Sequence, residues 1–527
     1  TEADLENISA MESLRRHPRA QIIGVEFQMS LAELFGEVGR RDDQLVSAFA
    51  ADSALSNIKK TVASPLKRWF DGLLFGETNM EFVSDGFEGD VAESMGKAWL
   101  NSGALTSARA QFERCRLARA KFVATWEIDA EEEAFASNGA LACAANEANV
   151  LAMLNRPGAA IARLEADLQA ATEQGPARGF AHLVLAQLYA DNGRLAEGLR
   201  ILDAEIARYG ETVDKRQPRI ELAKLLETRA KALGLGGKIA EAGADLDRAD
   251  ALLKAFLEED GNDRRGLLLR GELLTTIGEI AAFGGERVRA AVTFRAADDL
   301  LSRLVDFDGS FRDWRLARAR LHLARADNAL RLYEGDADRK AALSSAEKFA
   351  RAAFEDVKAI GADKEDIVAG RLNVIAHVSL ARTLRLKGDA TAGHTLLDGA
   401  EAQIAAAGDG GSPLQNILNA TIADERGDLA TAEKDFARAR ANFERSIALQ
   451  KEFLKMEPSA SLVARDLLWT SIASARSLKA AGDAAALKAR LAEACALKSA
   501  AALSEYSLFA RDAETLETLA AGSGVKC

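Results

Sequence analysis

The sequence predicts an all-α protein built from stacked helical hairpins, and three observations support this fold class. Ala, Leu, Arg and Glu dominate a chain of 527 residues that contains only 7 Pro, and these four residue types are strong helix formers. Residue types that favour strands are nowhere clustered. One pattern of small and large apolar residues recurs along the chain. A single hairpin cannot bury its apolar face alone, so repeated hairpins must stack into a solenoid.

The recurring pattern has six positions. A small residue is followed three residues later by a larger apolar residue, then by Gly four further on. Ala or Gly comes five residues after that, then a large apolar residue and another small one. The clearest copy is Gly278, Ala281, Gly285, Ala290, Phe294 and Ala297. Two more copies are Gly96, Trp99, Gly103, Ala108, Phe112 and Cys115, and Ala420, Ala423, Gly427, Ala432, Phe436 and Ala439.

Each position of the pattern has a physical role. The small residues lie where the two helices cross, because a large side chain there would force the helices apart. The central Gly closes the first helix in the left-handed conformation. We expect this conformation at Gly103, Gly193, Gly285, Gly388, Gly427 and Gly482. An Asp follows three of these glycines and can cap the second helix, namely Asp389, Asp428 and Asp483.

We expect four regions along the chain. Residues 1–84 form an N-terminal helical region, in which 61–84 is irregular and rich in aromatic residues and Gly. Residues 85–260 and 261–505 form the N-terminal and C-terminal halves of the repeat array. Residues 506–527 form a C-terminal helix and a frayed tail. The stretch 61–84 is predicted to be a loop packed on the first units, and a binding loop is the alternative.

The pattern resembles the tetratricopeptide repeat (TPR), over most of residues 85–500. The resemblance implies a right-handed α-solenoid of about nine to ten TPR-like hairpins. Successive copies are farther apart than the about 34 residues of a usual unit. The distance between them also varies along the chain, so unit length is irregular. The segments Glu457-Pro458-Ser459-Ala460 and Phe307-Asp308 resemble connections in the repeat arrays of bacterial signalling and defence proteins. That second resemblance implies an attached effector domain.

Composition restricts the class of partner and the compartment. The net charge is −12, which argues against nucleic-acid binding, because such binding requires a basic face. No uncharged apolar run is long enough for a membrane span, so we expect no direct membrane insertion. The chain begins TEADLEN, so we expect that something was removed upstream of Thr1 or that the chain is cut from a longer protein. A cytoplasmic location is expected, and a periplasmic one if a signal peptide or anchor was removed.

The search for catalytic and metal-binding chemistry is negative. The five His have no second His, Cys or acidic residue at metal-ligand spacing on one helix face. No CxxC motif and no Cys/His cluster occurs, so we expect no structural zinc site. Four cysteines in so long a chain do not make a disulfide scaffold. Cys115 and Cys495 fall at small-residue packing positions, where Cys acts as a small hydrophobe. We therefore predict no catalytic residues, no metal and no cofactor.

In a TPR-like solenoid the first helix of each hairpin lines the concave face, so its outward side supplies the candidate partner-binding residues. Several C-terminal candidates are cations beside a Trp, and Arg forks bind carboxylates well. We therefore hypothesise that this part of the face takes an acidic or C-terminal peptide. The alternative is solvated helix charge paired with neighbouring acids. The candidates are Phe180, Gln187, Lys231, Arg382, Arg385, Trp469, Arg476 and Lys479.

The function that follows is a non-catalytic protein–protein interaction scaffold that binds a protein or peptide on its concave face. The alternative is the sensor or regulatory arm of a larger bacterial signalling or defence protein whose effector domain is not in this chain. The partner, the oligomeric state and the curvature of the solenoid do not follow from the sequence.

Overall fold

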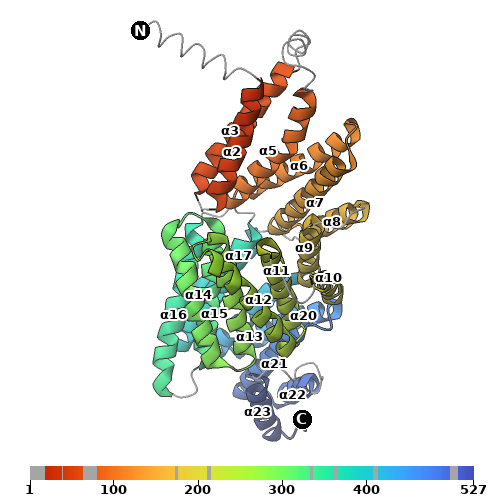
Figure 1. The fold of residues 1–527 in the computed structure, drawn as a ribbon. Coiled ribbons are helices and arrows are strands. Elements are labelled where there is room, and N and C mark those ends of the chain that lie inside the picture. The colour runs from red at the N-terminus through yellow and green to blue at the C-terminus, as the bar shows by residue number, and fades with distance from the viewer. Residues whose placement is uncertain are drawn as a thin grey trace, which may run out of the picture. The chain divides into compact units, whose positions relative to one another are not determined.

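The computed structural model describes residues 18–37, 40–62, 80–171, 176–209, 215–332, 336–360, 366–406, 413–498 and 508–527. Every regular element in these ranges is an α-helix, and none of these residues lies in a strand. The predicted all-α class is therefore confirmed, and the helices form a TPR-like repeat array (Figure 1).

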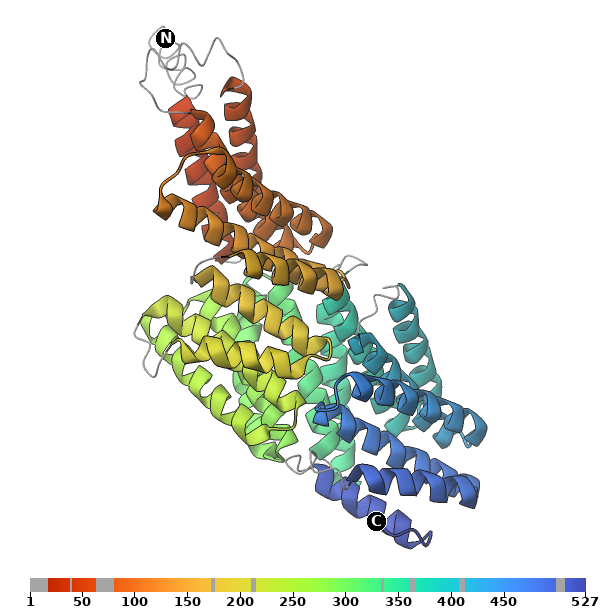
Figure 2. The same ribbon diagram turned by 90° about the vertical axis from the view of Figure 1, so that its right-hand side faces the viewer.

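The helices follow one another as hairpins, which Figure 2 shows from a second direction. The first helices of the hairpins are α2 (Pro18–Glu37), α5 (Met80–Ser102), α7 (Ala130–Met153), α9 (Pro176–Asp191), α11 (Arg216–Leu235), α13 (Arg264–Phe283), α15 (Arg312–Leu332), α17 (Ile367–Lys387), α19 (Pro413–Ala432) and α21 (Ser461–Ala481). The second helices are α3 (Arg41–Val62), α6 (Leu105–Thr125), α8 (Pro157–Ala170), α10 (Leu195–Ala207), α12 (Ile239–Glu259), α14 (Arg287–Phe307), α16 (Asp336–Ala359), α18 (Ala390–Ala406), α20 (Phe436–Met456) and α22 (Ala484–Lys498), and α23 (Leu508–Ala521) follows them.

The turns inside the hairpins share one geometry. In the described turns that contain a predicted glycine with positive φ, that residue follows the first helix, and the N–H of the next residue donates back to the carbonyl five positions before it. In the clearest copy, the N–H of Glu286 donates to the carbonyl of Ala281 at 2.8 Å, which is the long hydrogen bond of a Schellman turn. Five of the six glycines predicted to be left-handed have positive φ, and they are Gly103, Gly193, Gly285, Gly388 and Gly482.

The hairpin of α19 and α20 departs from the predicted register. Gly427 is not a turn residue, because α19 continues to Ala432. The residue with positive φ is Lys434, at 63°, and the N–H of Asp435 donates to the carbonyl of Ala430. Asp435, not Asp428, caps the second helix by accepting from the N–H of Arg438 at 3.1 Å. The predicted copy was therefore wrong by two helical turns, and Gly427 occupies its first small position.

With that correction, three hairpins place a Gly directly against a Phe of the partner helix. A Cβ built on Gly96 would lie 2.7 Å from the ring of Phe112, and one on Gly427 would lie 2.7 Å from Phe443. A Cβ on Gly278 would lie 2.4 Å from the ring of Phe294. All three rings are buried. The small positions are thus filled by glycine because the ring lies directly on the helix backbone.

The chain forms two compact units, and each is described separately. Among the described residues, unit 1 comprises those up to 154, 158–184 and 310–312, and unit 2 comprises 155–157, 185–309 and 313–527. The boundary expected at residue 260 falls inside unit 2. In unit 1 successive helices contact one another from α2 to α7. α5 begins at Met80, inside the stretch expected to be irregular, and residues 63–79 of that stretch lie outside the described residues.

In unit 2 the first helices also contact each other, with α11 on α13, α17 on α19 and α19 on α21. The array turns far enough to bring its ends together, because α21 contacts α11. The backbone N–H of Leu195 donates to Glu457 at 2.8 Å, and the Ser461 hydroxyl donates to the carbonyl of Gly236 at 2.9 Å. The first helices of unit 2 therefore line the inside of a superhelical turn that closes on itself.

The C-terminal end of unit 2 is tied down and is not frayed as predicted. Cys495 on α22 and Cys527, the last residue, form a disulfide. Val525 packs against the apolar cluster of α21, α22 and α23, in which Leu491 and Leu516 are buried. In the described part of the chain, no helix is long and apolar enough to cross a membrane.

Candidate functional site

The inner face of unit 2 carries charged side chains that are enclosed by neighbouring first helices. Arg382 and Arg385, two of the predicted residues, come from α17 and converge on Glu425 of α19. Arg382 Nε lies 3.1 Å and Arg385 Nε 2.6 Å from the Glu425 carboxylate, which is fully buried. Arg385 also contacts Asp428 at 2.8 Å. Two guanidinium groups are needed because an uncompensated carboxylate at that depth would be strongly unfavourable.

A cavity of about 160 Å³ lies beside this ion-pair cluster. It is lined by residues of α17, α19, α20 and α21, and it brings Arg382 and Trp469 of the predicted set together. Its polar lining includes Asp424, Gln450 and Asp466. Its lining residues are Arg382, Ile417, Thr421, Asp424, Gln450, Val463, Arg465, Asp466, Trp469 and Thr470.

Two hydrogen-bond acceptors of this lining have no donor within the described residues. Gln450 is 5% exposed, and its amide nitrogen donates to the Thr470 hydroxyl at 3.2 Å, but its Oε1 has no partner. Asp424 Oδ1 has none either. Leaving a buried acceptor without a donor costs about 1–3 kcal/mol. The lining of the cavity therefore includes two enclosed acceptors that lack a donor among the described residues.

The charges around the cavity explain the pKa of Asp424. Burial, followed by repulsion from Asp428, raises the pKa of the Asp424 carboxyl to about 7. Arg382 attracts it but is already engaged with Glu425, whose charge raises the pKa of Arg382 although burial opposes this. Asp424 is therefore a carboxyl whose charge is poorly compensated inside the cluster.

Lys231, another predicted residue, belongs to a separate cluster of unit 2. Its Nζ lies 2.7 Å from the carboxylate of Glu227, which also accepts from the Thr276 hydroxyl at 3.0 Å. Arg320 joins this cluster by contacting Glu279 at 2.5 Å. Burial and then the charge of Glu227 raise the pKa of Glu272 to about 7. The inner face thus holds a second carboxyl with incomplete charge compensation.

The remaining predicted residues are dispersed. Phe180 is half-buried in the part of α9 that belongs to unit 1, and Gln187 is exposed in the part that belongs to unit 2. Arg476 and Lys479 are exposed near the end of α21. The structure therefore brings together Arg382, Arg385 and Trp469, and it places Lys231 elsewhere. Whether any of these residues binds a partner stays a prediction.

Sequence reasoning missed Asp424 because of the register error in α19, and it missed Gln450 because that residue lies on the second helix α20. A first helix that ended before Gly427 would place Asp424 in its last turn, close to solvent. With α19 continuing to Ala432, Asp424 lies in the helix interior, on the side that meets α21. The true end of α19 was not recognisable in the sequence, because Lys434 is not a residue type that commonly adopts the left-handed conformation. Gly427 was the only glycine nearby.

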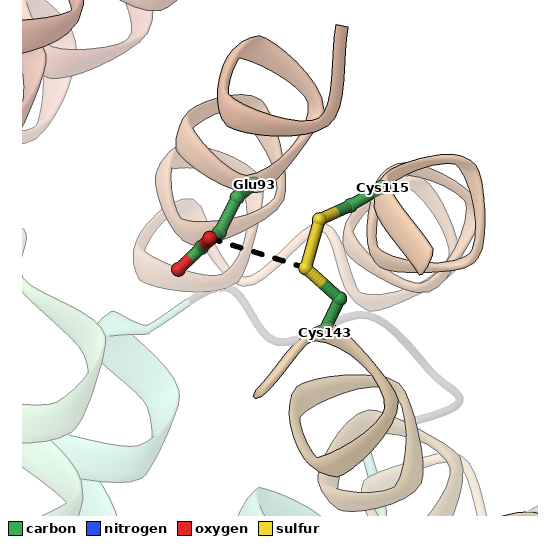
Figure 3. Close-up of side chains that lie close together, drawn as sticks. All are labelled: Glu93, Cys115 and Cys143. Atoms are coloured by element: carbon green, nitrogen blue, oxygen red, sulfur yellow. Dashed lines mark hydrogen bonds between the residues drawn. A yellow bond between two sulfur atoms is a disulfide. The ribbon is translucent and has the colours of Figure 1, made fainter. Parts of the chain in front are cut away.

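Unit 1 contains a cluster of two cysteines and a glutamate, which Figure 3 shows. Cys115 on α6 and Cys143 on α7 form a disulfide, and Cys143 Sγ lies 3.9 Å from Glu93 Oε2 on α5. The structure thus pairs all four cysteines of the chain, contrary to the expectation that Cys115 and Cys495 serve only as small hydrophobes. A bridged sulfur carries no proton, so the sulfur–carboxylate approach is a hydrogen bond only in the reduced form.

The same three side chains are close enough to hold a metal ion, with their ligand atoms within 4.8 Å of one another. Their chemistry in this structure does not suit one. The sulfurs are bonded to each other and so provide no thiolate. Glu93 is already paired with Lys97 at 2.8 Å and Arg119 at 3.2 Å. The cluster is therefore a structural connection among α5, α6 and α7.

No protein-family model and no curated protein sequence matches the chain. Solved structures that it resembles include a tetratricopeptide repeat protein from Parabacteroides merdae, with 12% identity and a TM-score of 0.32 over 62% of this chain and 98% of that one. A Rap protein complexed with competence and sporulation factor has 12% identity and a TM-score of 0.42, over 73% and 99%. A human IFIT1 dimer with m7Gppp-AAAA has 11% identity and a TM-score of 0.43, over 95% of both chains.

Proposed function

We propose that this chain is a non-catalytic scaffold that binds a protein or peptide partner on the inner face of unit 2. The observation that carries the proposal is the cavity at Trp469, where Asp424 and Gln450 leave acceptors without donors. The superhelical turn encloses this cavity on several sides. A binding site of this kind combines an apolar or aromatic wall with a few convergent polar groups.

The charge of the cavity favours a ligand that donates hydrogen bonds. Glu425 and Asp428 occupy Arg382 and Arg385, so these guanidinium groups are not available as an open carboxylate clamp. Asp424 has a hydrogen bond with Thr470 but no ion pair within the described residues, and its Oδ1 would be stabilised by a further donor. A backbone N–H or a protonated amine of a peptide supplies one. An acidic peptide remains a prediction for the exposed cations Arg476 and Lys479.

A peptide selection tests this function. Peptides from a random displayed library are selected on the wild-type chain, and their affinities are then measured for Trp469→Ala and Asp424→Asn. We expect each change to weaken binding by about tenfold or more, as is usual for a buried interface anchor. Asp299→Asn is the matched control, because Asp299 is exposed on the second helix α14. Equal binding to all four proteins would contradict the proposal.

The absence of nucleic-acid binding is a separate part of the proposal, and it rests on the net charge of −12. A chain without a basic face should not retard single-stranded or double-stranded RNA at physiological salt. An electrophoretic mobility-shift assay measures this directly. Retardation that weakens with added salt would show that the chain has enough local positive charge to bind phosphate and would contradict this part of the proposal.

A further inference from the structure

A second and larger cavity, of about 500 Å³, lies in unit 1. It is formed by α5, the end of α6 and the beginning of α7. Its volume falls within the usual range for sites that hold small molecules or side chains, about 300–1,000 Å³. It is lined by Phe82, Val83, Gly86, Phe87, Asp90, Arg119, Phe122, Asp129, Glu131, Glu132, Phe135 and Ala136.

The walls of this unit 1 cavity are aromatic. Phe82 and Phe122 have ring centroids 5.0 Å apart, and Phe87 lies on the same helix as Phe82. Phe135 on α7 is 69% exposed, although it lines the cavity. The Phe135 ring lies over the Arg119 guanidinium, with Cζ 5.8 Å from the ring centroid, so an apolar side chain is positioned at the mouth of an aromatic cavity.

The floor of the unit 1 cavity is a rigid arginine. Arg119 is 7% exposed, and its Nη2 contacts Asp90 at 2.6 Å and Glu93 at 3.2 Å. Its Nε has no hydrogen-bond partner within the described residues. A Cβ built on Gly139 would lie 2.3 Å from Arg119 Nη1, and a Cβ built on Gly89 would lie 2.5 Å from Arg119 Cγ. Arg119 therefore lies between two glycines, where side chains would leave it too little space.

The rim of the cavity is acidic. Asp129 is occupied in capping α7, where its carboxylate accepts from the N–H groups of Glu131 and Glu132 at 3.0 and 2.8 Å. The carboxylates of Glu131 and Glu132 are exposed and form no ion pair in the described part of the chain. The positive end of the helix dipole accounts for acidic residues in a first turn. It does not account for their position beside an aromatic cavity.

We infer that the unit 1 cavity binds a ligand in which an apolar ring or bulky side chain is joined to a protonated amine or guanidinium. The apolar part lies against Phe82, Phe122 and Phe135, and the cation lies against Glu131 and Glu132. Two sources share this chemistry, a free arylalkylamine and a peptide in which Phe is flanked by Lys. The inference is independent of the site in unit 2.

Calorimetric titration of the full chain with three probes of one ring size tests the chemistry. The probes are 2-phenylethylamine, neutral 2-phenylethanol and the anion phenylacetate. We expect affinity to fall in that order, because only the amine gains from the acidic rim. Acetyl-Lys-Phe-Lys-amide forms the peptide arm, and its binding in the absence of amine binding would assign the site to peptides. Binding of neither would overturn the inference, and so would a preference for phenylacetate.

Variants locate the binding. Phe135→Ala should weaken every probe by about tenfold, and it removes an exposed side chain, so the fold is not at risk. Glu131→Gln with Glu132→Gln should remove the preference for the amine over the alcohol and leave alcohol binding unchanged. Glu133→Gln is the matched control, since Glu133 is exposed in the same turn but does not line the cavity. Unchanged binding in Phe135→Ala, or an equal loss in Glu133→Gln, would place the ligand elsewhere.

Discussion

Gly278→Ala tests the packing on which the repeat is built. Replacing a mid-helix Gly by Ala normally stabilises a helix by about 1 kcal/mol. At Gly278 the new Cβ would lie 2.4, 2.6 and 2.9 Å from three ring atoms of Phe294, where ordinary contact begins near 3.4 Å. The ring is 2% exposed, so it has little room to move by the required ångström.

The expected magnitude follows from the two opposing terms. Overpacking of a filled core costs about 1–3 kcal/mol, and the helix gain offsets about 1 kcal/mol of it. We therefore expect Gly278→Ala to lower the free energy of unfolding by about 1 kcal/mol. Gly243→Ala is the control, because a Cβ there meets nothing within 4 Å, and it should be stabilising.

The assay is urea denaturation followed by far-ultraviolet circular dichroism, with hydrogen exchange used to localise the effect to α13 and α14. Local readout matters because stability in a repeat array is not uniform. Phe294→Leu should rescue Gly278→Ala, giving a coupling free energy of about 1 kcal/mol in a double-mutant cycle. If Gly278→Ala proved as stabilising as Gly243→Ala, the glycine–ring contact would be wrong.

Three further predictions concern other parts of unit 2. Lys434→Gly should raise the free energy of unfolding by about 1 kcal/mol in urea denaturation, because Lys434 has positive φ. A decrease of that size would mean that the second helix includes Lys434 and that Gly427 is the turn residue. Reduction, or Cys495→Ser with Cys527→Ser, should destabilise the C-terminal hairpin by at most about 3–4 kcal/mol, from the 32-residue separation of the bridge. Insensitivity of its hydrogen exchange to reductant would contradict the bridge. Because the pKa of Asp424 is raised to about 7, the native state holds its proton where the unfolded chain has lost it, so stability should fall as pH rises from about 4 to about 7. Asp424→Asn should remove this fall, which is at most about 4 kcal/mol for a shift from 3.8 to about 7, and an unchanged pH profile would show that the carboxyl is not shifted.

The pH dependence of Asp424 depends on the groups that face it from each neighbouring helix. Within its own helix α19, Glu425 and Asp428 repel it, and Arg382 attracts it from α17. From α20, neutral Gln450 lines the same cavity, and from α21, Thr470 forms a hydrogen bond with Asp424. The residues facing the cavity from α21 are Arg465, Asp466, Trp469 and Thr470.

Much of the fold could be predicted from the sequence because the same residue types recur at the turns and helix crossings of successive hairpins. Gly285 and Gly388 close their helices in the left-handed conformation as expected, since Gly is the residue that adopts it without strain. The prediction failed where that association failed. Gly427 is followed by an Asp, as a turn Gly often is, yet it serves as the small residue under Phe443, and the turn falls on Lys434.

The sites were harder to predict for a different reason. The unit 2 cavity is assembled from α17, α19, α20 and α21, so its acceptors come from separate hairpins that no local pattern connects. Trp469 and Arg382 were found because they follow the phase of the repeat, whereas Gln450 lies on a second helix and does not. Disulfides were missed because Cys115 and Cys143 are 28 residues apart and both occupy ordinary helical packing positions.

Hydrogen exchange on adding a selected peptide shows which face of unit 2 the partner covers. We expect protection to be concentrated in α17, α19 and α21, and Asp424→Asn to remove it. Protection confined to the second helices α12 and α14, or absent from unit 2, would contradict binding on the inner face.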